Sequence, residues 1–326
     1  MPKTKELSGF EALVTAAKKY RAKVKTLGRG AVVVVANEKG GIGKSTITAL
    51  MGSALAEVGL RVLVIDIDPQ SSVTQMILPN LEKLPQPAIG DLLTTDFDSD
   101  EAIFPQDIII EVTPGSVYNN GAAGKLYLLP SNPHLGKLNN FLATNINGRQ
   151  LLRFLLKELD LDGRTLASSY DVIVIDTPSQ LDSVFAESAL IAGDVVVMPA
   201  TPRPVDQWAI AQTIQKIKEA SKVANRGLEI VAAVVNMYDP RSGLVESEGL
   251  DAVKAVLGDR VVDPPIRSLK TIANSPAKSL SLLTAGQVQK PADDFRQTAA
   301  EVLDRIVNKL DKGFGKSVSR GNTDGK

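Results

Sequence analysis

The sequence of 326 residues contains no cysteine, one histidine and one tryptophan. The absence of cysteine excludes disulfide bonds, cysteine-ligated zinc and iron–sulfur clusters. The single histidine, His134, has no second imidazole or thiol with which to share a metal ion, so we interpret it as structural or exposed. Aromatic residues make up 4% of the chain and are scattered, which argues against a base-stacking surface for single-stranded nucleic acid.

Long hydrophobic runs and an excess of one charge are also missing. The longest apolar runs, such as residues 194–200, are too short to span a bilayer, and no signal-peptide pattern opens the sequence. We therefore expect a cytoplasmic protein with no stable membrane association. The formal net charge is +0, but residues 1–30 are mainly basic, residues 69–111 mainly acidic, and residues 264–292 contain bases and no acid. Because local potential matters more than the total, a neutral chain can still bind a polyanion.

Short runs that are apolar throughout recur along the chain, with helix-length segments between them. These runs are residues 31–37, 61–68, 126–131, 171–178, 194–200 and 229–238. Continuous apolarity predicts strands buried on both faces, as in a parallel sheet covered by helices. We therefore predict one α/β domain over residues 29–312, with a doubly wound, mainly parallel sheet. Such sheets bind ligands at the carboxyl ends of their strands.

The two ends of the chain are predicted to lie outside this domain. Residues 1–28 form a basic helical extension, in which Ser8 and Glu11 have capping-box spacing and apolar residues recur at helical spacing. This helix either packs its apolar stripe on the domain or a second copy, or contacts DNA or a partner. Residues 313–326 are predicted to be disordered.

The segment "VVVVANEKGGIGKST", residues 32–46, places an apolar strand directly before a glycine-rich turn and a helix. Glycines let the backbone N–H groups point inward at phosphate oxygens, and the N-terminus of the helix adds a positive dipole. Lys44 is placed for the β- and γ-phosphates, Ser45 for Mg²⁺ and Thr46 for the α-phosphate. This combination predicts a P-loop. The residues assigned to the nucleotide on this ground are Gly40, Gly41, Ile42, Gly43, Lys44, Ser45 and Thr46.

Carboxylates follow two of the other apolar runs. Asp66 and Asp68 end one run, and Asp176 ends another. A carboxylate at the end of a buried strand is costly unless it meets a cation or hydrogen bonds, and a nucleotide-bound Mg²⁺ is a natural partner. All three are predicted to lie at the same edge of the sheet as the glycine-rich turn.

These motifs together resemble those of the ParA/MinD ATPases. "KGGIGKST" resembles their deviant Walker A motif, and "DIDPQ" and "VIVIDTP" resemble their A′ and Walker B motifs. The resemblance covers about residues 30–310 and implies a P-loop NTPase fold that binds ATP and Mg²⁺. The sequence departs from the family pattern at Glu38, where many relatives have glutamine, at Ser45, where threonine is usual, and in the acidic stretch 79–125.

The resemblance also implies roles for individual residues. Lys39, the extra lysine of the loop, would reach the phosphates bound by the partner subunit of an ATP-dependent homodimer. Asp68 would position the attacking water, while Asp66 and Asp176 would hold Mg²⁺ together with the hydroxyl of Ser45. Asn236, which ends a strand, would help to recognise adenine.

ParA-like members of the family bind DNA without sequence preference and are stimulated by a ParB-like adaptor, whereas MinD-like members dock an amphipathic C-terminal helix on membrane. Arg241 aligns with a basic residue that contacts DNA in ParA relatives. Arg267, Lys270 and Lys278 are further candidates for DNA contacts. We assign residues 303–310 to the last core helix, because interleaved acidic residues weaken attraction to anionic lipid.

The expected function is therefore that of a nucleoid-associated partition ATPase for plasmid or chromosomal DNA. Hydrolysis should be slow without an activator, because no built-in arginine finger is recognisable. The alternatives are an ATPase that positions a protein assembly and a MinD-like membrane switch.

Overall fold

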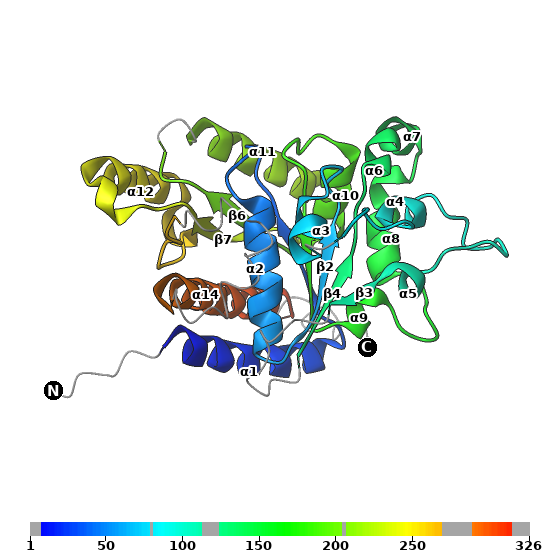
Figure 1. Cartoon of the computed structure of the whole chain (residues 1–326), viewed down its shortest axis with the longest axis horizontal. Coiled ribbons are helices and arrows are strands. Elements are labelled where there is room, and N and C mark those ends of the chain that lie inside the picture. Colours follow the sequence, from blue (N-terminus) through cyan, green and yellow to red (C-terminus); the bar gives the residue numbers. More distant parts are fainter. Residues whose placement is uncertain (1–7, 79–80, 113–123, 204–206, 269–288, 315–326) are drawn as a thin grey trace, which may run out of the picture.

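The computed structural model describes residues 8–78, 81–112, 124–203, 207–268 and 289–314. Within these residues the chain forms a seven-stranded sheet in the order β3-β4-β2-β5-β1-β6-β7 (Figure 1). Neighbouring strands are parallel except for β3 and β4. The strands are β1 (Ala31–Val35), β2 (Arg61–Asp66), β3 (Ile110–Val112), β4 (Lys125–Leu129), β5 (Val172–Asp176), β6 (Val195–Ala200) and β7 (Ile230–Val235). The predicted doubly wound, mainly parallel sheet is confirmed.

The central strands are buried on both faces, and their side chains alternate between two core layers. In β1, Val32 and Val34 belong to one layer and Val33 and Val35 to the other. One layer is covered by α1 (Gly9–Leu27), α2 (Lys44–Glu57), α3 (Ser72–Ile77) and α14 (Gln289–Phe314). The other is covered by α4 (Ile89–Leu92), α5 (Pro105–Ile108), α6 (His134–Lys137), α7 (Asn139–Thr144), α8 (Leu151–Lys157), α9 (Leu166–Ser169), α10 (Val184–Ala192), α11 (Gln207–Val223) and α12 (Leu244–Leu257).

The edge strand β3 was not expected from the sequence. It lies in the acidic stretch and has only three residues, of which the central Glu111 is exposed and forms an ion pair with Lys125 of β4. A strand this short, interrupted by a charge, leaves no continuous apolar run.

The predicted N-terminal helix is present as α1, which begins after Ser8 with the expected capping box to Glu11. It lies alongside α14 (Figure 1), and Leu13 and Tyr20 are fully buried in the shared core layer. The Tyr20 hydroxyl donates to the carbonyl of Asp171 (2.8 Å) and accepts from the N–H of Ala31 (3.1 Å). The apolar stripe of this helix is therefore packed on the domain. The proposed domain boundary at residue 28 stays a prediction.

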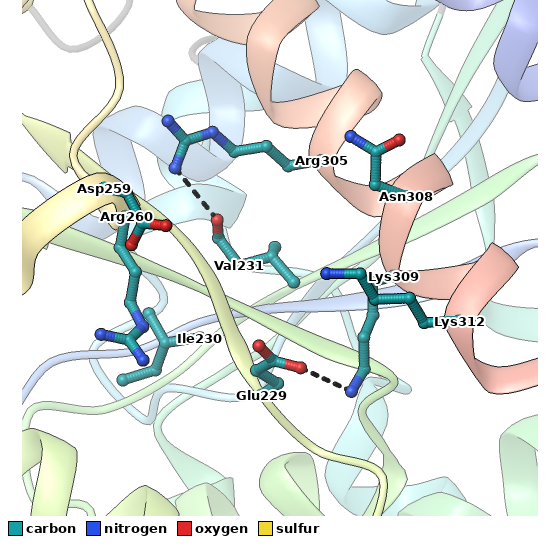
Figure 2. A pocket seen from close by; sticks show the side chains of 9 residues that line it. All are labelled: Glu229, Ile230, Val231, Asp259, Arg260, Arg305, Asn308, Lys309 and Lys312. Atoms are coloured by element: carbon teal, nitrogen blue, oxygen red, sulfur yellow. Dashed lines mark hydrogen bonds and ion pairs between the residues drawn. The ribbon is translucent and has the colours of Figure 1, made fainter.

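The C-terminal helix α14 is part of the core, as predicted for residues 303–310. Leu303 and Ile306 are each 1% exposed. Polar contacts hold α14 to the amino end of β7 around a cavity of about 400 Å³ (Figure 2). Arg305 donates to the carbonyl of Val231 at 3.3 Å, and an ion pair joins Lys309 to Glu229 at 2.6 Å. In the described part of the chain, none of the helices has both the length and the apolar character that a membrane span requires.

Strand pairing brings the predicted site residues to one edge of the sheet. Asp176 lies level with Asp66 in the β2–β5 register and with Val35 in the β1–β5 register. The loop that follows β1 and the carboxylates that end β2 and β5 therefore meet.

Candidate functional site

The glycine-rich loop connects β1 to α2, as the sequence predicts. Gly41 and Gly43 adopt left-handed backbone conformations, with φ of 73° and 91°. An L-residue is strained there, so glycine is the residue that allows this curled loop. Helix α2 begins at Lys44, which places Ser45 and Thr46 in its first turn. The loop and the helix N-terminus together form an arrangement that favours phosphate groups.

Lys44 is held inside the loop. Its side chain folds back so that Nζ donates to the carbonyl of Lys39 at 2.9 Å, and the residue is only 7% exposed. Burial lowers the pKa of Lys44 from its ordinary value. The negative charges of Asp176, Asp68 and Glu38 oppose that shift. A partly desolvated ammonium group in this position is stabilised further by any anion that enters the loop.

Asp66 and Asp176 are both fully buried, and each accepts a hydrogen bond from a threonine that the sequence did not single out. The Asp176 carboxylate accepts from the hydroxyls of Ser45 (2.7 Å) and Thr48 (3.1 Å). Asp66 accepts from both the N–H and the hydroxyl of Thr74, each at 2.8 Å. The structure thus brings together all three residues predicted to hold the metal ion.

Burial raises the pKa of both carboxyls. For Asp66 it outweighs the hydrogen bonds from Thr74 and raises the pKa to about 6. For Asp176 burial acts together with the charge of Asp66 and raises the pKa well above its usual range. Two neighbouring buried carboxylates are costly to ionise, and a divalent cation removes that cost. Carboxylates beside a serine hydroxyl are oxygen donors of the kind that Mg²⁺ prefers, so this set fits the ion that accompanies a nucleotide.

Asp68 follows β2 and lies beside a cavity of about 590 Å³. Its side chain accepts from the N–H of Gln70 at 2.9 Å, and its carbonyl accepts from Ser71 N–H and from the Ser131 hydroxyl, each at 2.8 Å. The segment after β5, including Ser179, also lines this cavity. Asp68 is thus a partly exposed carboxylate on a fixed backbone, next to a space that water can enter.

The start of the loop is fixed by residues that the sequence did not identify. Asn37 is 2% exposed, and its amide donates to the carbonyl of Pro199 at 2.7 Å. Its Oδ1 accepts from the N–H of Lys39 (2.9 Å) and from the hydroxyl of Thr213 in α11 (3.2 Å). The backbone of Lys39 is therefore anchored, while the side chain is half-buried at the edge of the loop. The one local signal for Asn37 was its position at the end of a predicted strand.

Asn236 contacts the loop directly. Its Nδ2 donates to the carbonyl of Ile42 at 3.0 Å, and the residue is 7% exposed. A Cβ added at Gly43 would lie 2.2 Å from the same Nδ2. Asn236 therefore supports the loop from the end of β7, and its predicted contact with adenine stays a prediction.

The structure describes two of the four predicted DNA-binding residues, Arg241 and Arg267, and a parallel bridge between Tyr238 and Arg267 brings their segments side by side. Arg241 lies in the short 3₁₀ helix η4 (Pro240–Ser242), is exposed, and pairs with Asp239 at 3.0 Å. Arg267 is 41% exposed and pairs with Asp294 at 3.1 Å. Lys270 and Lys278 lie outside the described residues, as do residues 315–326 of the segment 313–326 that was predicted to be disordered. Residues 313 and 314 of that segment are helical and end α14. The assignment of these bases to DNA stays a prediction.

The chain is similar in sequence to a known protein family and to characterised proteins. A family model described as AAA domain (AAA_31) matches residues 30–230. The sporulation initiation inhibitor protein Soj of Bacillus subtilis is 25% identical over 274 residues, which cover 84% of this chain and 98% of Soj. The chromosome partitioning protein ParA of Caulobacter vibrioides is 27% identical over 275 residues, which cover 84% of this chain and 94% of that protein.

The fold is also similar to that of solved structures. Cobyrinic acid a,c-diamide synthase from Mycobacterium smegmatis, solved with a bound ATP analog and magnesium, superposes with a TM-score of 0.63 at 24% identity. The match covers 87% of this chain and 97% of the synthase chain. At this identity the likeness concerns the fold alone. The family match, the two relatives and the loop with its carboxylates lead to one assignment: the chain belongs to the AAA_31 family of AAA domains and is a P-loop ATPase of the ParA/MinD family.

Proposed function

We propose that this chain is a partition ATPase: it binds ATP with Mg²⁺, dimerises around the nucleotide, and in that form binds DNA without sequence preference. The observation that carries the proposal is the presence of two lysines in one phosphate loop. Lys44 occupies the position from which a lysine reaches the phosphates of its own subunit, so a second lysine at position 39 has another task.

ATP and Mg²⁺ fit the donors of the site. The N–H groups of the loop and the Lys44 ammonium would hold the phosphates, and Ser45 with Asp176 and Asp66 would hold Mg²⁺ and its waters. Bound Mg·ATP supplies the phosphoanhydride bond that is hydrolysed. Asp68, beside the cavity, would orient the attacking water.

Lys39 is proposed to act across the dimer. Two triphosphates facing each other concentrate negative charge at one interface, and a lysine supplied by each subunit offsets it. Since the contact exists only with ATP bound, the nucleotide stabilises the dimer by mass action. The anchored backbone of Lys39 restricts where its ammonium group can reach.

Hydrolysis by this chain alone is proposed to be slow. Among the described residues, the cavity beside Asp68 is lined by no lysine or arginine. An arginine that stabilises the transition state is worth roughly 10³–10⁵ in rate, so a partner that supplies a cation would act as a strong activator. A ParB-like adaptor bound to cargo DNA would be such a partner, and the protein would act in the cytoplasm on the nucleoid.

The ATP-bound dimer is proposed to bind DNA and not a membrane. The apolar side of α14, which would have to face lipid in a MinD-like switch, is packed against α1 and the sheet. One of the relatives, ParA of Caulobacter vibrioides, is a chromosome partitioning protein by name, which agrees with a DNA cargo.

The dimer is tested with Lys39→Ala. Light scattering with ATP and Mg²⁺ should show a dimer for the wild type and a monomer for the variant, while both bind labelled ATP. Lys218→Ala, an exposed lysine of α11, is the matched control and should dimerise normally. A normal dimer of Lys39→Ala would contradict the trans role of Lys39.

DNA binding is tested by co-sedimentation of the ATP-bound protein with plasmid DNA over a range of salt concentrations. The log–log slope should be about −0.9 for each phosphate neutralised, and Arg241→Glu should weaken binding and flatten the slope. If liposomes sediment the protein and DNA does not, the membrane alternative is favoured instead.

A further inference from the structure

The phosphate loop contains a carboxylate where a negative charge is unfavourable. Glu38 lies directly before Lys39, and its side chain is only 19% exposed. A negative charge beside a site for a triphosphate repels the ligand. The loop therefore needs a feature that offsets this charge.

Both oxygens of the Glu38 carboxylate are engaged by groups from other elements. Oε1 accepts from Nζ of Lys216 in α11 at 2.6 Å. Oε2 accepts from the N–H of Leu181, in the segment that follows β5, at 3.2 Å. Lys216 Nζ also lies 3.7 Å from Asp182, but that carboxylate is 75% exposed, so Glu38 is the closer and better shielded partner.

The same side of α11 also holds the backbone of the loop. Thr213, three residues before Lys216, accepts from the N–H of Glu38 at 2.9 Å and donates to Oδ1 of Asn37 at 3.2 Å. Positions three apart lie on one side of a helix, so Thr213 and Lys216 reach the loop together. Thr213 thus positions the backbone of the loop, whereas Lys216 offsets the charge of the Glu38 side chain.

The protonation behaviour of the lysines agrees with this pairing. Burial would lower the pKa of Lys216, but the hydrogen bonds and charges of Glu38 and, after it, Asp182 outweigh burial and raise the pKa. The charge of Glu38 also acts on Lys44, where it opposes the effect of burial. Glu38 therefore influences the lysine assigned to the phosphates, and its charge state matters to the site.

We propose that Lys216 is a positioning residue for ATP binding: its ammonium group neutralises Glu38 and so keeps the loop attractive to the phosphates. The inference rests on the proposed function, since it concerns affinity for ATP at the same site. It goes beyond the loop motif, because the neutralising charge comes from a helix 178 residues further along the chain.

The proposal predicts that the affinity for ATP rises with the net charge of the Glu38–Lys216 pair. Equilibrium dialysis with labelled ATP and Mg²⁺ measures this affinity. Lys216→Met leaves Glu38 uncompensated and should weaken binding about tenfold at low salt. Glu38→Gln removes the negative charge from the loop while Lys216 keeps its weaker contact with Asp182, and it should tighten binding several-fold. The double variant should return close to the wild type. The charge-conserving Lys216→Arg and the exposed-surface control Lys218→Met should both bind as the wild type does.

A structural role would give a different pattern. The differences between variants should shrink as salt rises from about 0.05 M to about 0.5 M, because the Debye length falls from more than 10 Å to less than 5 Å. If Lys216→Met weakens binding equally in the Glu38→Gln background and at every salt concentration, Lys216 supports the fold only and the proposal is wrong. Urea unfolding of each variant shows whether a loss of binding comes with a loss of stability, which would also count against it.

Failure of this inference differs from failure of the proposed function. If the wild type binds no more ATP than Lys44→Ala, the ATPase assignment itself is contradicted and the inference with it. If the wild type binds ATP and Lys216→Met binds it equally at low salt, only the inference is wrong.

Discussion

Replacement of Gly43 by alanine tests whether the loop is shaped by Asn236 as the structure shows. Gly43 has φ of 91°, and its new Cβ would lie 2.2 Å from Nδ2 of Asn236. The left-handed conformation costs an alanine about 1–2 kcal/mol. The contact also forces the Asn236 amide away from the carbonyl of Ile42, and loss of that hydrogen bond costs about 1 kcal/mol.

The sum is about 2–3 kcal/mol of unfolding free energy for Gly43→Ala. If the whole cost falls on the loop conformation that binds ATP, affinity should drop about 30- to 150-fold. Urea unfolding measures the first quantity, and equilibrium dialysis with labelled ATP measures the second.

Gly41→Ala is the matched control. Gly41 also has a left-handed backbone, with φ of 73°, but a Cβ there meets nothing within 4 Å. It should therefore lose only the conformational part, about 1–2 kcal/mol. Adding Asn236→Ala should recover part of the stability of Gly43→Ala, because it removes the atom that clashes. Equal losses for the two glycine variants, with no recovery from Asn236→Ala, would refute the reasoning.

Three further changes test other parts of the molecule. Lys44→Ala should abolish ATP binding in equilibrium dialysis, because it removes the loop ammonium, and unchanged affinity would exclude the P-loop assignment. Asp68→Ala should bind ATP and dimerise but release phosphate roughly 10²–10⁴ times more slowly, as expected when a group that orients water is lost; a variant that fails to bind ATP would show that Asp68 belongs to the metal site. Asp194→Asn should lower the unfolding free energy by about 3 kcal/mol at pH 7, because it breaks a largely buried ion pair with Arg29 (2.7 Å) and Lys157 (2.9 Å). Burial alone would raise the pKa of Asp194, but these two cations hold it below its ordinary value. Its stabilisation is therefore complete above about pH 4 and is lost as the pH falls through the lower folded-state pKa, so urea unfolding should show the gap between wild type and variant closing in acid.

The sequence alone was sufficient for the local part of the site. A strand, a glycine turn and a helix in immediate succession predict a curled loop from Gly40 to Lys44, because glycines allow the left-handed backbone that such a turn requires. The same holds for Asp66 and Asp176: each ends an apolar run, and parallel strands bring their carboxyl ends to one edge. Local patterns of this kind predicted the phosphate loop, the carboxylates beside it and the sheet that carries them.

The groups that support these residues could be identified only from the tertiary structure. No local sequence pattern distinguishes Thr48, Thr74 and Thr213 from other threonines in helices. Strand β3 was too short and too polar to give a recognisable strand pattern. The hydrogen bond from Asn236 to the carbonyl of Ile42, 194 residues away, also had no local signal, and the predicted contact of Asn236 with adenine stays a prediction.

The neutralisation of Glu38 illustrates why such supporting groups cannot be identified from the sequence. A carboxylate in the loop is visible in the sequence, but whether it repels a phosphate depends on which cation lies beside it. That cation, Lys216, comes from a helix that packs against the loop only because the apolar side of α11 joins the core through Ile210 and Ile217. Backbone conformation is set by neighbours along the chain, whereas burial, charge compensation and hydrogen-bond partners are set by neighbours in space.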